Sequence, residues 1–301
     1  METWVVITVA AAFLQNIRST LQKHLKGVMG TTGATFVRFG YGIPFALVFV
    51  AVLHFGAGYE IPAPNASFAM WVVIGALAQI FAQALLVHLF SFRNFAVGTA
   101  YSRTEPAQAA LFALLFFAEK ATAGALIAIA ISVVGVMLIS VARSPVSPRT
   151  LVTSVFSRTA MIGIASGTFF GIAAVAYRAA SLSLGYPNFM MQAAMTLICG
   201  IVFQTVIMFV WMRLREPEEI RRVGKAWKVG LAVGFVGASA SFGWFMAFTL
   251  QQAAIVKALA QIEMLFTFAS SVFIFREKIN RLEIIGCLLI VLGILVLLLH
   301  D

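Results

Sequence analysis

Residues 94–141 read NFAVGTAYSRTEPAQAALFALLFFAEKATAGALIAIAISVVGVMLISV, and a related stretch follows 158 positions later, at residues 252–299. At that offset, and without a gap, Glu105 falls on Glu263. Further matched pairs include Glu119 with Glu277, Lys120 with Lys278, Gly135 with Gly293, Gly27 with Gly185 and Phe90 with Phe248. A register kept over this length predicts a tandem repeat, each copy covering about half of the chain.

The composition indicates which solvent the chain folds in. Hydrophobic residues make up 61% of the sequence, charged residues 11%, and the mean hydropathy is +0.99. Soluble domains carry about 25% charged residues, and apolar runs of about 20 residues are long enough to cross a bilayer as helices. We therefore predict an all-α polytopic membrane protein with ten transmembrane helices. The predicted spans are 3–22, 33–54, 67–91, 95–117, 122–142, 159–182, 188–212, 228–250, 254–275 and 281–299.

Five spans fall in each repeat, which gives a first repeat at 1–142, a cytoplasmic linker at 143–158 and a second repeat at 159–301. Lys and Arg gather in alternate connections, and basic residues are retained on the cytoplasmic side of short loops. Both termini are thus expected outside. An odd number of spans inserts the second repeat the other way up, as in many secondary transporters. The net charge of +10 is then mainly a topology signal, and a nucleic-acid partner is not expected.

The fourth predicted span carries the most unusual residues. Tyr101, Arg103 and Glu105 lie roughly at mid-bilayer, and Pro106 should break the helix there. Such breaks are tolerated beside protein or a water-filled cavity, and intramembrane ionisable residues are candidates for function. The alternative is that Arg103 and Glu105 only neutralise each other. In the second repeat Met264 replaces the proline, so only the first repeat is expected to have a broken helix.

Other polar or aromatic residues fall on stripes of the predicted spans and are candidates for the lining of a cavity. These are Gln15, Arg18, Gln79, Gln83, Tyr177, Ser241 and Trp244. The amides could equally be hydrogen-bonded glue between helices, and the aromatic residues could be core packing. Cations near the predicted helix ends are expected to snorkel or to act as interfacial anchors. This applies to Arg38, Arg178 and Lys257, and for Arg18 both readings stay open.

Several residues are assigned structural roles. Gly163, Gly167 and Gly171 form a doubled GxxxG pattern that allows close helix packing, and Glu119 and Glu277 are expected to cap helix ends or form interfacial salt bridges. Cys199 and Cys287 lie singly in apolar spans. We find no HExxH, GxSxG, Cys/His cluster or Walker A loop, so no enzyme, metal, cofactor or direct ATP drive is expected.

The two five-helix repeats, the mid-helix Glu105-Pro106, the acid at 119 and the glycine at 135 resemble the drug/metabolite transporter superfamily, specifically its ten-helix EamA-like exporters. The resemblance implies export of amino acids and other small metabolites. It also implies a basket of helices one, three, four, six, eight and nine around a central cavity, with five and ten outside it. The glutamate that small multidrug members carry in the first helix has no counterpart here, so a simple proton/drug exchange is not expected.

Before any snorkelling is counted, cations within the predicted spans outnumber acids there, and an excess of positive charge favours an anionic or zwitterionic cargo. We expect a secondary active exporter of amino acids or similar carboxylated metabolites working by alternating access. Arg103 would meet the carboxylate, Glu105 or Glu263 the ammonium or a coupling proton, and Trp244 with Tyr101 the apolar part. The alternative is a proton-coupled exporter of organic cations or drugs, with aromatic residues providing cation–π contacts. The expected location is the bacterial inner membrane, and the sequence leaves monomer or homodimer open.

Overall fold

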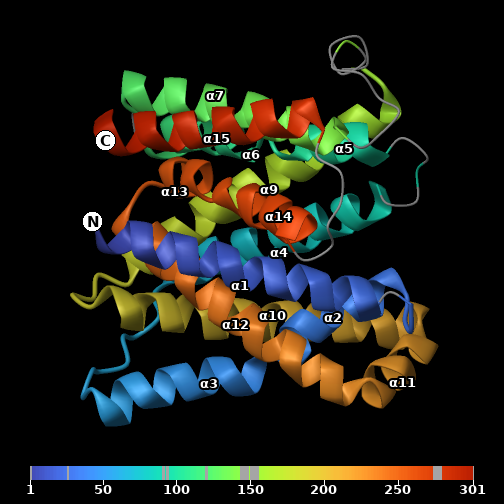
Figure 1. The fold of residues 1–301 in the computed structure, drawn as a ribbon. Coiled ribbons are helices and arrows are strands. Elements are labelled where there is room, and N and C mark those ends of the chain that lie inside the picture. Colours follow the sequence, from blue (N-terminus) through green and yellow to red (C-terminus); the bar gives the residue numbers. More distant parts are fainter. Residues whose placement is uncertain are drawn as a thin grey trace. The chain divides into compact units, whose positions relative to one another are not determined.

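The computed structural model describes residues 2–25, 27–89, 92, 95–118, 121–142, 149, 156–273 and 280–300. Helices make up the fold, and the described ranges contain no β-strand (Figure 1). In chain order the helices are α1 (Thr3–Leu25), α2 (Thr31–Gly40), α3 (Ile43–Ala51), the π-helical η1 (Val52–Gly56), α4 (Ala66–Leu89), α5 (Phe95–Ser102), α6 (Glu105–Phe117), α7 (Ala123–Val141), α9 (Arg158–Ser183), α10 (Phe189–Arg215), α11 (Pro217–Lys225), α12 (Trp227–Leu250), α13 (Ala253–Leu259), α14 (Ile262–Phe273) and α15 (Arg281–His300).

Eight helical segments in the described part of the chain are long and apolar enough to cross a membrane. They correspond to eight of the ten predicted spans, with α2, α3 and η1 together forming the second. The other two predicted spans, 95–117 and 254–275, are each divided into two shorter helices. The all-helical membrane class is confirmed, and the count of ten spans stays a prediction.

Both repeats contain a broken helix, so the prediction of a break in the first repeat alone was wrong. The first break, at residues 103–104, separates α5 from α6, and the second, at 260–261, separates α13 from α14. Each is a tight turn closed by i→i−3 hydrogen bonds, such as Arg103 N to Ala100 O at 3.1 Å and Gln261 N to Ala258 O at 3.2 Å. Since such turns need no proline, Met264 does not keep the second helix continuous.

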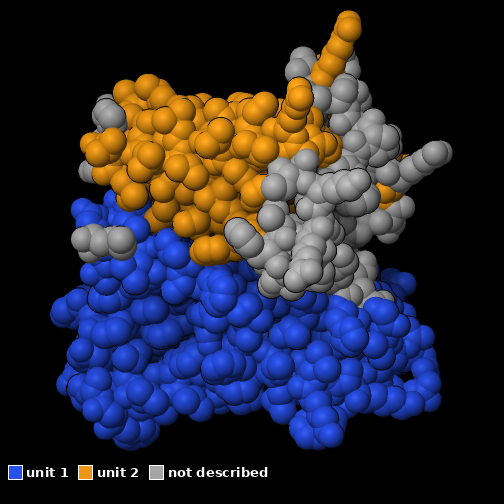
Figure 2. All heavy atoms as spheres, in the orientation of Figure 1, with its two compact units in different colours: residues 1–80, 176–251 blue, residues 81–175, 252–301 orange. Residues whose placement is uncertain are grey.

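The chain forms two compact units, and each takes segments from both sequence repeats. Unit 1 comprises residues 1–80 and 176–251, and unit 2 comprises residues 81–175 and 252–301 (Figure 2). The helices α4 and α9 each contribute residues to both units. Most of the predicted linker, 143–158, lies outside the described residues. The compact units are therefore interleaved along the sequence, whereas the repeats follow one another.

In unit 1, α1 lies along α12, and small residues bring the two helices close together (Figure 1). A Cβ added to Gly243 would lie 2.9 Å from the Cβ of Ala11. The same helix α12 meets the end of α2, where a Cβ on Gly234 would lie 2.4 Å from the carbonyl oxygen of Tyr41. These contacts leave no room for larger side chains, so α1, α2 and α12 are fixed against each other over the residues that carry the polar groups of this unit.

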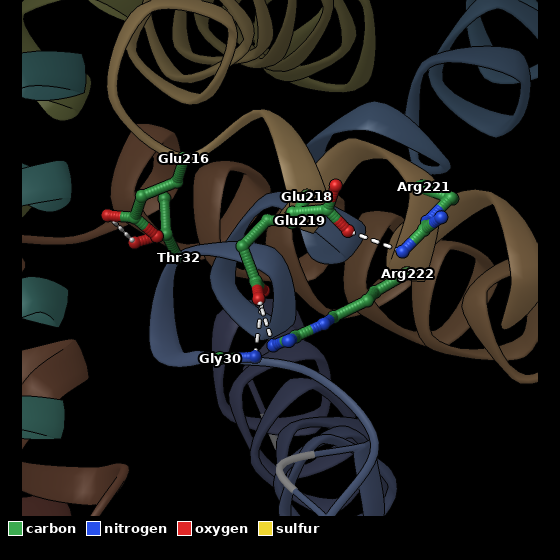
Figure 3. A network of polar contacts seen from close by, with 7 residues as sticks. All are labelled: Gly30, Thr32, Glu216, Glu218, Glu219, Arg221 and Arg222. Atoms are coloured by element: carbon green, nitrogen blue, oxygen red, sulfur yellow. Dashed lines mark hydrogen bonds and ion pairs between the residues drawn. The ribbon is translucent and has the colours of Figure 1, made fainter.

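The segment between α10 and α12 forms the short helix α11, which is held to the start of α2 (Figure 3). The buried carboxylate of Glu219 accepts hydrogen bonds from Gly30 N at 2.7 Å and from Arg222 Nη1 at 2.8 Å. A Cβ on Gly33 would lie 2.4 Å from Glu219 Oε2. A negative group at a helix N-terminus satisfies otherwise unpaired N–H groups and interacts favourably with the helix dipole. Glu219 thus joins α11 to α2.

In unit 2, α7 and α15 lie side by side, one from each repeat (Figure 1). A Cβ on Gly135 would lie 2.7 Å from Gly286 O, and one on Gly293 would lie 2.1 Å from Ser132 Oγ. Glycines matched at the repeat offset therefore serve as packing points in both copies.

The start of α15 is a capping box: Asn280 Oδ1 accepts from Leu282 N, and Glu283 Oε2 accepts from Asn280 N.

Candidate functional site

The two broken helices of unit 2 meet through ionisable side chains. Lys257 Nζ lies 2.9 Å from Glu105 Oε1, and Arg103 Nη1 lies 3.8 Å from Glu263 Oε2. Each acid belongs to the first turn of its helix, α6 or α14, where the helix dipole favours a carboxylate. Each acid is paired with a cation from the other repeat. The alternative in which Arg103 and Glu105 neutralise each other is therefore not the arrangement found, and Lys257 is part of this cluster and does not act as an interfacial anchor.

The backbone at the first break is also contacted by polar side chains. Gln261 Nε2 lies 3.5 Å from the carbonyl oxygen of Arg103, so the second broken helix reaches a carbonyl at the break of the first. Gln108 donates to Thr104 Oγ1 at 2.7 Å and accepts from Thr168 Oγ1 at 2.5 Å. These amides and hydroxyls provide partners close to a helix interruption, as a break within a membrane requires.

The glycines of α9 pack against this same broken helix. A Cβ on Gly163 would lie 2.0 Å from Gly98 O, and a Cβ on Gly167 would lie 2.9 Å from Ser102 O. At Gly171 the nearest atom is Ala109 N, 3.2 Å away. The doubled GxxxG pattern thus lies directly over α5 and α6. Pro106 is buried in the first turn of α6, where its missing N–H costs no helical hydrogen bond.

A second polar cluster lies in unit 1 and surrounds a small cavity. Gln79 Oε1 accepts from Gln204 Nε2 at 2.8 Å and from Tyr177 Oη at 3.3 Å, and Arg38 Nη2 lies 3.4 Å from Ser241 Oγ. The cavity has room for about one water molecule. Its lining residues are Arg38, Phe39, Gln79, Tyr177, Leu197, Ile201, Gln204, Ser241 and Phe245. The residues that line this cavity come from helices α2, α4, α9, α10 and α12.

Two buried arginines belong to this unit. Arg38 is 5% exposed and Arg18 6% exposed, so the expectation that Arg38 snorkels to the surface was wrong. Both side chains pass over Gly237, where an added Cβ would lie 3.3 Å from Arg18 Cδ and 3.4 Å from Arg38 Cγ. The missing side chain at Gly237 gives the arginine stems space inside unit 1. The sequence placed Arg38 near the end of a predicted helix, and this position suggested exposure. Its burial could not be seen there, because the helix that covers it, α12, is distant in sequence.

Arg178 also has a specific position. Its Nη1 lies 2.5 Å from Phe248 O and 2.7 Å from Gln251 O, at the carboxyl end of α12. Cations are favoured at that end of a helix, where carbonyl groups lack intrahelical partners. The expectation that Arg178 snorkels outward was therefore wrong, and the residue caps α12.

The predicted binding residues are divided between the two units. Unit 1 holds Gln15, Arg18, Gln79, Tyr177, Ser241 and Trp244, and unit 2 holds Gln83, Tyr101, Arg103, Glu105 and Glu263. Trp244 donates to Gln15 Oε1 at 3.0 Å, while Tyr101 is buried in an apolar cluster with Val97 and Val141. Gln83 is half-buried. Glu119 and Glu277 lie outside the described residues.

Sequence reasoning assigned no binding role to several polar residues of these clusters, among them Arg38, Gln204, Lys257 and Gln261. Gln204 is one of two glutamines in the apolar span 188–212, and its partners Gln79 and Tyr177 come from two other helices. An amide in such a span is the signal that could have found it, because a buried amide requires partners. The described residues contain no group of three or more His, Cys, Asp or Glu side chains that could hold a metal ion.

These features define a class: a multi-pass helical membrane protein built from a tandem repeat, with a broken helix in each copy. The chain belongs to the EamA-like transporter family, whose sequence profile matches residues 2–141 and again residues 157–299. The family lies within the drug/metabolite transporter superfamily, so the resemblance drawn from the repeat is confirmed and the protein is assigned to the membrane transporters.

Comparison with solved structures gives the same architecture. A structure titled only "Crystal structure of protein" aligns over 100% of this chain and 97% of its own, with a TM-score of 0.74 and 18% sequence identity. At that identity the likeness shows the fold and carries no information on cargo. Among curated proteins no sequence match was found.

Proposed function

We propose that this protein is a secondary active transporter that exports small carboxylated metabolites, amino acids among them, by alternating access. The proposal places it in the bacterial inner membrane with both termini on the outer side. In this mechanism one or both acids of unit 2 carry the coupling proton or meet the ammonium group of the cargo.

The observation that carries the proposal is the meeting of the two broken helices in unit 2. Discontinuous helices in inverted repeats form the substrate and ion sites of many secondary transporters. Here each break bears a carboxylate, and each carboxylate is paired with a cation from the other repeat. Because the pairs Lys257–Glu105 and Arg103–Glu263 join the repeats, a change of partner at either acid alters contacts between them. That is the kind of two-state element that alternating access requires.

The balance of charge supports an anionic or zwitterionic cargo. The two ion pairs described in unit 2 contain two cations and two acids, so neither carboxylate is left as a bare counter-ion for an organic cation. In unit 1, Arg38 is buried and forms no ion pair with any described carboxylate. A region with excess positive charge attracts anions and repels organic cations.

Counterflow in proteoliposomes tests the proposal. Vesicles containing purified protein are loaded with one unlabelled amino acid at a time, and uptake of the same radiolabelled compound is measured against protein-free vesicles. We expect counterflow for at least one amino acid, and its dependence on external pH should change in Glu105→Gln and Glu263→Gln. If the vesicles transport quaternary amines but no amino acid or organic acid, the alternative function, an exporter of organic cations, would be established instead. Unchanged pH profiles in both variants would remove the acids from coupling.

A further inference from the structure

The polar cavity of unit 1 is rich in donors and poor in acceptors. Arg38 Nε is buried and has no hydrogen-bond partner among the described residues. The Oε1 atom of Gln79 accepts two hydrogen bonds, and the described residues offer no partner to its Nε2. The hydroxyl of Ser241 is contacted by Arg38 Nη2 at 3.4 Å. Arg38, which has an unused donor, and Gln79 thus line one small space, and no carboxylate is among its lining residues.

The positive charge in this region is concentrated further by Arg18. Its stem crosses the same glycine, Gly237, as the stem of Arg38, and both residues are buried. Two like charges held close together away from water are unfavourable, and the burial of a cation carries a desolvation cost. The protein nevertheless holds this arrangement with glycine at 237. Binding of an anion beside Arg38 would offset this repulsion.

We infer that the cavity lined by Arg38, Gln79, Tyr177, Gln204 and Ser241, with Arg18 beside it, binds a carboxylate group of the transported compound. This inference rests on the proposed function and assigns the carboxylate to unit 1, where sequence reasoning had assigned it to Arg103. A planar guanidinium matches the two oxygens of a carboxylate, and the amide of Gln79 supplies a further donor.

The lining of the cavity agrees with this assignment, and its size limits what can enter. Room for about one water molecule is less than a carboxylate fills, so the lining side chains must shift to admit the group, and a whole metabolite does not fit. The apolar members of the lining, Phe39, Leu197, Ile201 and Phe245, exclude water and strengthen the interaction between ligand and arginine. Tyr177 and Gln204 hold Gln79 in place through hydrogen bonds of 3.3 Å and 2.8 Å. Two neighbouring helices, α9 and α10, therefore hold Gln79 at the cavity.

A matched pair of probes tests the site without assuming the natural cargo. Purified protein in detergent is heated with 3-phenylpropionate or with its neutral amide, 3-phenylpropanamide, at constant ionic strength. We expect the carboxylate to raise Tm by a few degrees, because a ligand that binds the folded state stabilises it, and the amide to have no such effect. The same Tm measurement is repeated with acetate, with inorganic phosphate and with chloride. Stabilisation by phosphate alone, or by no oxyanion above the chloride level, would overturn the inference.

Variants then locate the effect. Arg38→Met should weaken carboxylate binding at least about tenfold, as expected when a buried charged partner is removed, and Arg38→Lys should retain a reduced response. The ligand-free Tm of Arg38→Met should equal or exceed that of the wild type, because an apolar residue replaces a buried charge. Arg221→Met changes an exposed arginine and should bind the carboxylate normally. Gln79→Leu, on another helix, should weaken binding and serves if Arg38→Met does not fold.

The outcomes separate this inference from the proposed function. Carboxylate binding that depends on Arg38, in a protein that transports no carboxylated compound, would uphold the site and reject the proposed function. Carboxylate transport with undiminished carboxylate binding in both Arg38→Met and Gln79→Leu would uphold the function and reject the site.

Discussion

At the scale of single residues, Gly163 determines how closely α9 approaches the first broken helix. A Cβ at this position would lie 2.0 Å from the carbonyl oxygen of Gly98, so even a methyl group cannot fit without a shift of backbone. Gly163→Ala should lower the free energy of unfolding by about 1–3 kcal/mol, the usual cost of overpacking. A reduced Tm of the purified protein checks this prediction.

Gly224 provides the control for Gly163. It lies within α11, is exposed, and an added Cβ there would meet nothing within 4 Å. Gly224→Ala should be neutral or stabilising by up to about 1 kcal/mol, because alanine is the better helix former. An equal loss of Tm in both variants would show that helix propensity, and not the approach to Gly98, governs the result at Gly163.

The same scale shows what sequence patterns can and cannot reveal. The spacing of Gly163, Gly167 and Gly171 follows from the period of one helix, so a close-packed face could be predicted from the sequence alone. The position of Arg38 could not, because its burial depends on α12 and on Gly237, about 200 residues away. Likewise, the pairing of Glu105 with Lys257 depends on contacts between repeats, which helical periodicity does not encode.

At the scale of secondary-structure elements, the buried Glu219 and the exposed Glu218 make a matched pair on α11 (Figure 3). Both carboxylates contact an arginine three residues later, at 2.8 Å and 2.5 Å, but only Glu219 also accepts from the backbone of α2. Glu219→Gln should therefore destabilise the protein by about 1–3 kcal/mol, since it weakens a buried, charge-assisted contact. Glu218→Gln should change stability by less than about 1 kcal/mol, as for other surface pairs.

Chemical denaturation of the two variants, followed by tryptophan fluorescence, provides the measurement. High salt should reduce the small effect of Glu218→Gln and leave most of the effect of Glu219→Gln, because buried charges are screened less. If the two variants lose the same stability, then the contact of Glu219 with Gly30 does not hold α11 to α2.

The two broken helices show how accurately the limits of the helices could be predicted from the sequence. The predicted spans 95–117 and 254–275 begin and end within two residues of the helices observed there. The repeat offset also placed Glu105 and Glu263 at equivalent sites, at the starts of α6 and α14. Proline was taken as the sole cause of a break, and this was the error. Short turns at 260–261 interrupt the second helix just as effectively, with Gln261 contacting the backbone of Arg103.

At the scale of the whole molecule, the repeats and the compact units divide the chain differently. Each unit contains residues from both repeats, so each polar cluster is built from residues of both. The ion pairs of unit 2 and the contact of Arg38 with Ser241 in unit 1 all join one repeat to the other. Internal symmetry in the sequence therefore indicated where functional residues would be found, while their partners depended on how the repeats interleave.

Labelling of single cysteines tests the inverted orientation of the repeats. In a background with Cys199 and Cys287 replaced by serine, we introduce Glu2→Cys, Lys225→Cys or a cysteine appended after Asp301. A membrane-impermeant maleimide should label both terminal cysteines in intact bacterial cells. Lys225→Cys, at the exposed and basic end of α11, should be labelled only after permeabilisation, because basic loops stay in the cytoplasm. Termini on opposite sides would mean an odd number of spans and would reject two five-span repeats. Both termini inside would keep the even number of spans and reverse the orientation of every one of them.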